Sequence, residues 1–321
     1  MNVLTLNDKP EKLQECLELI TQAFNYPPDH SYKDDFALLV EEANHSNCYF
    51  IEQDQEVVAT LFTLPRVLTY KELEIPVLFM GGISVKDANR GGGLFRSLLE
   101  TVTLLNSNNA LYLLWSDLSS LYEKFSFHEF GLVQELVSSQ DLSTLEKLGP
   151  ANKSIKSQLQ KMYLELSDSS LMPKRSDKDW DLLLTSPSID FLQDSSGSVY
   201  FIGKGHDLQG ICHEHYLFDK SDQPQVPKLW NYNPSESATN LRYMGFLRLG
   251  NLEVLNALIE KTSKGRLKII EREENLIKVL FDGEPFELSD KDFIQGLWGP
   301  GKITEWLGLV PQINIMGFDS V

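Results

Sequence analysis

The 321-residue sequence predicts an α+β (α/β) fold, with a mixed, mostly antiparallel central sheet flanked by helices and a second α+β module behind it. The first observation is the order of apolar patterns: helices, three strands joined by short turns, then helix, strand, helix and strand. The second is a polar stretch around residues 138–155 that carries Gly149 and Pro150. The third is composition, because 42% hydrophobic and 23% charged residues suit a packed core. We therefore expect domains at 1–140 and 155–321.

The first domain opens with an amphipathic helix, since Leu13, Leu17, Ile20 and Phe24 fall on one helical face. Strands rich in β-branched and aromatic residues follow, and a glycine pair inside the third, Gly81-Gly82, suggests a bulge. The expected elements are, in order, helices at 10–24 and 33–43, strands at 48–53, 57–70 and 72–85, a helix from 94 to 105, a strand at 110–116, a helix at 118–125 and a strand at 127–137.

The second domain shows the same kinds of pattern without a strict repeat, which permits a degenerate duplication of the first. Its elements are expected as helices at 153–166 and 176–184, strands at 189–193, 198–204 and 208–216, a strand within 238–251 that leads into a helix, a hairpin of 266–273 with 275–288, and a helix at 289–297. The last residues, "INIMGFDSV", read as an apolar strand that runs to the end of the printed sequence.

The composition also limits the classes of partner that we expect this protein to bind. A formal net charge of −17 argues against nucleic acid, because phosphate binding needs clustered Lys and Arg. Cys16, Cys48 and Cys212 are too widely spaced for a disulfide framework or a zinc pattern, so a reducing compartment fits. Neither a basic leader nor a membrane-length apolar run occurs, so we expect a cytoplasmic protein with no membrane partner.

The most informative stretch is "DANRGGGLFRSLLE" at residues 87–100, where three glycines separate a strand from a helix. The first amides of a helix lack internal acceptors and carry partial positive charge. Glycines let such amides approach an anion, and Arg90 adds a fixed charge. The loop is neither a Walker loop nor a GxGxxG dinucleotide loop. It predicts a pyrophosphate site, with an ordinary strand-to-helix turn as the alternative.

This loop resembles the (Arg/Gln)-x-x-Gly-x-(Gly/Ala) signature that GNAT-family N-acetyltransferases carry between their fourth strand and third helix. Arg90 and Gly93 match the signature. Phe95 departs from it, and together with Leu94 and Arg96 it is similar to the variant of Eis-type acetyltransferases.

A second motif supports the resemblance. The segment "SSLYEKFSFHEFG" is similar to the family's Tyr-x-x-Gly-Phe segment, with Tyr122, Phe125 and Phe127 in place and Ser126 where glycine is common. The resemblance covers residues 1–137, and the rest is only loosely similar to the second GNAT-like region of tandem members.

The resemblance implies an acetyl-CoA site, and separately we expect no metal cofactor. Main chain at Ile83, Ser84 and Val85 would pair with the pantetheine arm, and the bulge would separate the fourth strand from the fifth. Tyr122 would be the general acid that protonates the departing thiolate, with an aromatic packing role as the alternative. The residues implied for the cofactor are Ile83, Ser84, Val85, Arg90, Gly91, Gly92, Gly93, Leu94 and Phe95.

The general base stays open at this point. Eis-type enzymes use the chain terminus, so Asp319 or the carboxylate of Val321 could reach the cleft, although the last residues here do not match theirs closely. The other candidates are Glu52, Glu56, Asp117, His128 or a carboxylate of the second domain.

Other interpretations also stay open. "CHEH" at 212–215 puts His213 and His215 on one face of a strand, but two histidines do not make a metal site and a half-exposed strand explains them. The expected activity is transfer of an acetyl group to the amine of a small molecule or peptide by direct attack. The alternatives are a Fem-type aminoacyl or acyl transferase and a non-catalytic acyl-CoA-binding module. A homo-oligomer is possible.

Overall fold

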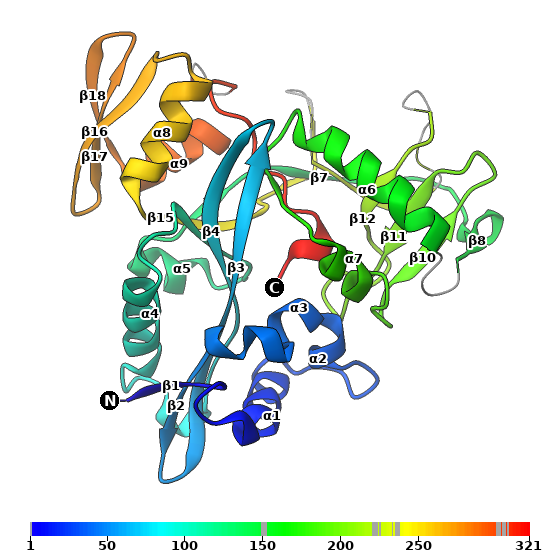
Figure 1. Ribbon diagram of the computed structural model, residues 1–321, viewed down its shortest axis with the longest axis horizontal. Coiled ribbons are helices and arrows are strands. Elements are labelled where there is room, and N and C mark those ends of the chain that lie inside the picture. Colours follow the sequence, from blue (N-terminus) through cyan, green and yellow to red (C-terminus); the bar gives the residue numbers. More distant parts are fainter. Residues whose placement is uncertain are drawn as a thin grey trace.

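A computed structural model describes residues 2–148, 153–219, 226–232, 238–299 and 308–321, together with 224, 234, 303 and 306. These residues form three sheets with helices packed around them (Figure 1), which confirms the mixed α+β class. Gly149 and Pro150, on which the expected linker depends, lie outside the described residues.

The first sheet carries the long strands β3 and β4 and is mostly antiparallel. Its order is β1-β2-β3-β4-β5-β15-β6, and β9 adds to β3. The strands are β1 (Val3–Thr5), β2 (Cys48–Gln53), β3 (Glu56–Tyr70), β4 (Leu73–Val85), β5 (Leu111–Leu114), β6 (His128–Phe130), β9 (Met172–Pro173) and β15 (Gly245–Leu249).

Helices cover both faces of this sheet. α1 (Leu13–Ala23) packs on β3 and β4 from one side, in a core with Leu39 and Phe79. α4 (Leu94–Leu105) packs from the other side, in a separate core with Met80 and Leu114. The two faces therefore have distinct cores, as alternation along the buried strands requires.

The helix expected at 33–43 is wrong in its continuity. The chain forms α2 (Tyr32–Asp35), α3 (Ala37–Val40) and a 3₁₀ segment at Glu42–Asn47. Phe36 has φ −117° and ψ 44°, outside helical geometry, and this residue separates α2 from α3.

The single strand expected at 127–137 is also wrong. β6 belongs to the first sheet and β7 (Val133–Val137) to the second, and Gly131 between them has φ +67°. A Cβ at Gly131 would lie 2.8 Å from that of Met244, so the close approach and the turn both favour glycine here.

The second sheet has the order β14-β7-β13-β12-β11-β10-β8. Its further strands are β8 (Glu146–Lys147), β10 (Asp190–Gln193), β11 (Val199–Ile202), β12 (Cys212–Tyr216), β13 (Lys228–Asn231) and β14 (Leu241–Arg242). The chain also forms α5 (Ser119–Tyr122), α6 (Lys153–Ser167) and α7 (Asp177–Leu183), and a capping box at Ser176 and Asp179 begins α7.

The third sheet lies apart from the other two. The expected hairpin is a three-stranded meander of β16 (Leu267–Glu273), β17 (Leu276–Phe281) and β18 (Glu284–Ser289), with α8 (Leu252–Thr262) and α9 (Asp290–Trp298) against it. The expected strand 275–288 is wrong because Asp282-Gly283, both with positive φ, turns the chain once more.

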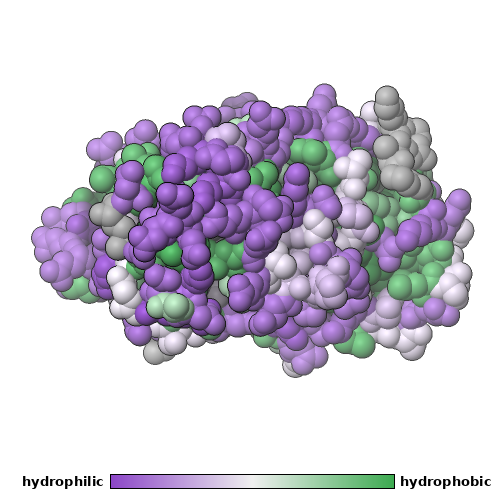
Figure 2. Space-filling view, turned by 90° about the horizontal axis from the view of Figure 1, so that it is seen from below, coloured by the Kyte–Doolittle hydropathy of each residue, from purple (hydrophilic) through white to green (hydrophobic). Residues whose placement is uncertain are grey.

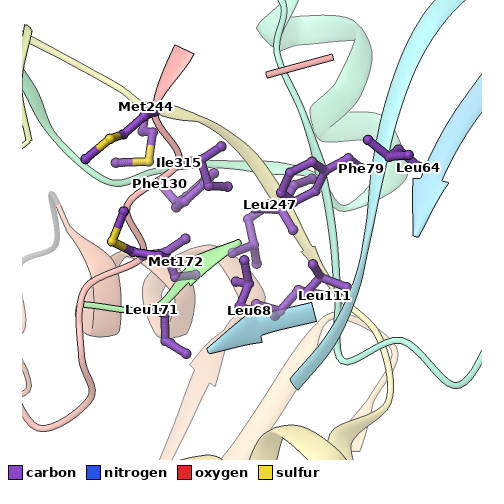
Figure 3. Close-up of a cluster of buried hydrophobic side chains, with 14 of the residues drawn as sticks. Leu64, Leu68, Phe79, Leu111, Phe130, Leu171, Met172, Met244, Leu247 and Ile315 are labelled. Carbon is purple, nitrogen blue, oxygen red and sulfur yellow. The ribbon is translucent and has the colours of Figure 1, made fainter. Parts of the chain in front are cut away.

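The first sheet joins the rest of the chain through a continuous apolar core. Figure 3 shows Leu64, Leu68, Phe79 and Leu111 of the first sheet beside Leu171, Met172 and Ile315. Two strands cross the division expected at 140–155: β7 lies in the second sheet and β15 in the first.

The outer surface differs from this core in character. The face seen in Figure 2 is mostly hydrophilic, with its hydrophobic residues in separate patches. Within the described residues, no helix has both the length and the apolar character that a membrane crossing requires.

Candidate functional site

The predicted bulge is confirmed in β4. Thr60 pairs with Ser84 and Phe62 with Gly81, so Gly82 and Ile83 face a single residue of β3. Gly82 has φ +56°, and its carbonyl accepts a hydrogen bond of 2.7 Å from the Thr60 hydroxyl.

β4 and β5 separate at this bulge. Their parallel pairing ends at Met80 with Leu114, while β4 continues to Val85. Beyond Met80, no strand of the described residues pairs with the β5 side of β4. The main chain at residues 83–85 therefore borders a gap into which another extended chain can pair.

The glycine loop leads from this gap into α4. Gly93 occupies the position before the helix with φ +79°, and Gly91 has the same φ. A Cβ at either glycine would meet nothing within 4 Å, so conformation and not crowding favours glycine. The first amides of α4 lack intrahelical acceptors.

Arg90 lies at the edge of the same loop. Its side chain is 60% exposed and forms an ion pair of 2.8 Å with Asp87, while its Nε donates weakly to the Val85 carbonyl at 3.4 Å. A surface pair of this kind is weak, so the guanidinium remains able to meet an anion at the loop.

Tyr122 ends α5 on the α4 face of the sheet. Its ring packs against Phe95, Phe127 and Phe246, in the core that includes Met80 and Leu114 at the separation point. Burial raises the pKa of Tyr122 to about 12, against a smaller lowering by a hydrogen bond with Ser116. The phenol is therefore protonated at neutral pH.

On the opposite face, the last residues of the chain reach the bulge. A Cβ at Gly81 would lie 2.7 Å from the main-chain carbonyl carbon of Val321, and 3.2 Å from both the Val321 Cβ and a methyl of Leu39. Figure 1 places this end at the middle of the molecule, beside β3, α3 and α7. The expected terminal strand is reduced to one bridge between Ile313 and Leu171, followed by a 3₁₀ turn at Gly317–Asp319.

A small pocket opens beside Val321. It is lined by Asp35, Phe36, Leu39, Leu64, Lys204 and Ser320, among others. Asp35 is buried, and its Oδ2 accepts from the Tyr26 hydroxyl. Its Oδ1 has no hydrogen-bond partner among the residues that the structure describes.

Lys204 lines the pocket and binds the main chain of residues 317–320. Its Nζ donates to the carbonyls of Gly317 at 3.0 Å and Ser320 at 2.5 Å, and lies 4.7 Å from the Phe36 ring centroid. Burial lowers the pKa of Lys204 to about 7, and nearby Asp319 and Asp35 oppose this shift.

The other candidates for the general base lie in different parts of the structure. Glu52 pairs with Lys9 and Glu56 with Lys86, both beside the β2–β3 turn. Asp117 is exposed. His128 lies on β6, separated from β5 by β15, and burial lowers its pKa.

Asp319 is enclosed by cations. Its carboxylate accepts from Arg66 at 3.1 Å and from Arg175 at 2.6 Å, and is fully buried. Both arginines, with Asp35 and Lys204, were missed by the sequence analysis. Nothing in the local pattern marks them, since each comes from a different element and only the fold brings them together.

The half-exposed strand expected for "CHEH" is wrong, because β12 is buried along its length and only His215 is partly exposed. The Nε2–H of the His213 ring donates to the Gly203 carbonyl at 2.7 Å, and a Cβ at Gly317 would fall 2.4 Å from the ring. Burial lowers the pKa of His213 to about 3 and that of His215 to about 4. Within the described ranges, no three His, Cys, Asp or Glu side chains gather into a metal-binding group.

Comparison with known proteins gives a family for the first part of the chain. Residues 7–130 match the family model described as an acetyltransferase (GNAT) domain. No curated protein matches the sequence.

Solved structures are similar over nearly the whole length. A GCN5-related N-acetyltransferase from Kribbella flavida aligns with TM-score 0.61 and 11% identity, covering 92% of this chain and 90% of its own. One from Anabaena variabilis gives 0.58 and 13%, covering 98% and 97%. Eis1 from Mycobacterium abscessus gives 0.56 and 11%, covering 90% and 85%. At these identities the likeness establishes the fold.

Proposed function

Residues 7–130 belong to the GNAT acetyltransferase family, and from that premise we propose that this protein transfers an acetyl group from acetyl-CoA to an amine. In this proposal residues 1–140 hold the donor, and residues 155–321 complete the cleft that selects the acceptor. One observation carries the proposal: the separation of β4 from β5 at Gly82 lies between Tyr122 on one face and Val321 on the other.

The donor site follows from exposed main chain. Amides of residues 91–95 would hold the pyrophosphate at the start of α4, helped by Arg90. The β5 side of β4 at Ile83, Ser84 and Val85 would pair with the amide-rich pantetheine arm. The thioester carbonyl then lies at the bulge, where a backbone N–H can stabilise the developing oxyanion.

The chemistry is a direct displacement. The amine nitrogen attacks the thioester carbonyl carbon, the carbon–sulfur bond breaks, and the departing thiolate takes a proton from Tyr122. The Tyr122 phenol carries its proton at neutral pH, as a general acid must until the thiolate forms.

The amine must lose one proton, and Asp319 and Val321 are the candidates that the sequence analysis offered on the acceptor face. Asp319 is held by two arginines, so it is poorly suited to accept a proton. In the 321-residue chain, the carboxylate of Val321 borders Gly81 and would take the proton instead.

Asp35 supports a cationic acceptor. Its Oδ1 lies in the pocket wall and has no hydrogen-bond partner in the part of the chain that the structure describes, and an unsatisfied buried carboxylate oxygen is costly. An ammonium group of the acceptor would satisfy it.

The test is a turnover assay of the purified protein with acetyl-CoA and a panel of amines, following free CoA and acetylated product by mass spectrometry. We expect amine-dependent product, with positively charged diamines favoured over neutral alcohols of equal size. Tight acetyl-CoA binding without any product from the panel would favour the non-catalytic module.

A further inference from the structure

We propose that Asp319 is a positioning residue: with Arg66 and Arg175 it latches residues 317–321 into the cleft and so fixes Ser320 and Val321 on the acceptor side of the bulge. The inference rests on the proposed function for its catalytic meaning. The part of the proposal that concerns structure, namely that this ion cluster holds residues 317–321 in place, depends only on the contacts described below.

The first observation is the completeness of the contacts to Asp319. Oδ2 accepts from the Nη2 and Nε of Arg175 at 2.6 and 3.0 Å, and from the Tyr163 hydroxyl at 3.4 Å. Oδ1 accepts from Arg66 at 3.1 Å and from the Nε of Arg175 at 3.3 Å. Bidentate pairing of this kind fixes orientation as well as charge.

The second observation is that each arginine is itself held. Arg175 makes a second bidentate pair with Glu214 on β12, at 2.7 and 2.8 Å. Its guanidinium lies 4.1 Å from the ring centroid of Tyr163 and 4.7 Å from that of Trp180. Arg175 therefore cannot follow Asp319 if the segment moves.

Arg66 is anchored in the same way from the first sheet. Its Nη1 donates to Asp179 at 2.9 Å, and Asp179 is the residue that closes the capping box of α7. The cluster thus joins β3, α7, β12 and the last turn of the chain. Asp319 is the member that ties residues 317–321 to the other three.

The third observation is that residues 317–321 are closely packed, so another conformation of this segment would lose several contacts. Gly317 lies against the His213 ring, where a Cβ would fall 2.4 Å away. Lys204 binds the carbonyls of Gly317 and Ser320. At the far end Val321 meets Gly81. Asp319 lies between these contacts, two residues before the one that faces the bulge.

Charge explains why Asp319 and not an apolar residue holds the turn. Arg66 and Arg175 supply two guanidinium groups among the carboxylates of Asp179, Glu214 and Asp319. Removing one buried carboxylate leaves cationic groups with fewer acceptors, which is costly in a buried cluster. The turn therefore stays bound while the cluster is complete.

The test compares Asp319→Asn with Asp290→Asn. Asp290 is a matched control, since it is equally buried and accepts two hydrogen bonds from one arginine, Arg272, but it lies beside the third sheet. Three readouts apply to each variant: release of C-terminal residues by carboxypeptidase, the dissociation constant of acetyl-CoA, and kcat and KM for the best amine.

We expect carboxypeptidase to remove Val321 and Ser320 from Asp319→Asn much faster than from the wild type, and kcat to fall about 10²-fold with an unchanged acetyl-CoA constant. Asp290→Asn should resemble the wild type in its rate of carboxypeptidase release and in kcat. If Asp319→Asn does not fold, Arg66→Gln removes one side of the latch and keeps the Arg175–Glu214 pair, with a smaller effect in the same direction.

An Asp319→Asn protein as resistant to carboxypeptidase as the wild type would overturn the latch. Segment release with unchanged kcat would overturn its role in positioning. A wild type that turns over no amine would count against the proposed function, and the carboxypeptidase comparison would still decide whether Asp319 holds the segment.

Discussion

The proposed role of Tyr122 as general acid can be tested without disturbing the packing around its ring. Tyr122→Phe keeps the ring contacts with Phe95, Phe127 and Phe246 and removes the hydroxyl group, with its hydrogen bond to Ser116. We expect kcat to fall about 10²-fold or more, because general acid catalysis contributes on that scale. The acetyl-CoA dissociation constant, measured by calorimetry, should stay the same.

Tyr112→Phe is the matched control for Tyr122→Phe. Tyr112 is also a buried tyrosine, but its hydroxyl donates to the main-chain carbonyls of Thr103 and Asn106. Its loss should lower stability by about 1 kcal/mol and leave kcat near the wild-type value. Equal losses of kcat in the two variants would contradict the acid role of Tyr122.

Gly81 tests the contact between the bulge and the last residue. Gly81→Ala places a methyl 2.7 Å from the carbonyl carbon of Val321, so the last residues must shift, and the φ of Gly81 itself is not strained. We expect kcat to fall at least tenfold while thermal unfolding shows a folded protein, because misplacement near the reacting atoms is costly. Wild-type kcat in a folded Gly81→Ala protein would argue against any role of Val321.

At the scale of elements, the glycine loop depends on a backbone conformation that glycine adopts more readily than other residues. Gly93→Ala puts a side chain at φ +79°, which costs about 1 kcal/mol. Gly92→Ala, whose φ is not positive, should cost less. Urea unfolding of both variants checks this order, and equal stability of the two would show that the backbone does not need glycine at position 93.

The elements also show what could be predicted from the sequence. The loop, α4, the bulge and the meander of β2, β3 and β4 follow from local patterns, because each is a short segment with a clear apolar period or a glycine signal. The places of β1 and β15 in the first sheet do not follow from such patterns. The break at Gly131 and the third strand at residues 284–289 depend on single turn residues inside apolar runs. Such turns were read as strand continuations.

The residues of the acceptor side could not be predicted in this way. Asp35, Lys204 and Asp319 come from α2, the end of β11 and the last turn, far apart in the sequence. Each has an ordinary local context, and only packing of the second sheet against the first brings them into one pocket. The polarity that marks the site is therefore a property of the tertiary structure.

For the whole molecule, Lys204 links pH to stability. The pKa of Lys204 is about 7 in the folded protein and near its ordinary 10.5 when unfolded, so the unfolded chain binds more protons between these values. Stability must therefore rise with pH across this window, by about 2 kcal/mol from pH 7 to pH 9 for this group.

Lys204→Met removes that dependence. We expect the free energy of unfolding of the wild type, relative to Lys204→Met, to increase from pH 7 to pH 9 in urea titrations. A difference between the two proteins that stays constant with pH would show that Lys204 is not titrating in this range.

The central claim concerns the whole first domain: that its gap and glycine loop bind acetyl-CoA. The most direct measurement is calorimetric titration of the wild type, Arg90→Glu and Arg266→Glu with acetyl-CoA. Arg266 is a matched control, since it is half-exposed and paired with Asp282 near the third sheet. We predict micromolar binding by the wild type and by Arg266→Glu, and loss of binding in Arg90→Glu. A well-folded wild type that binds no acetyl-CoA would contradict the account.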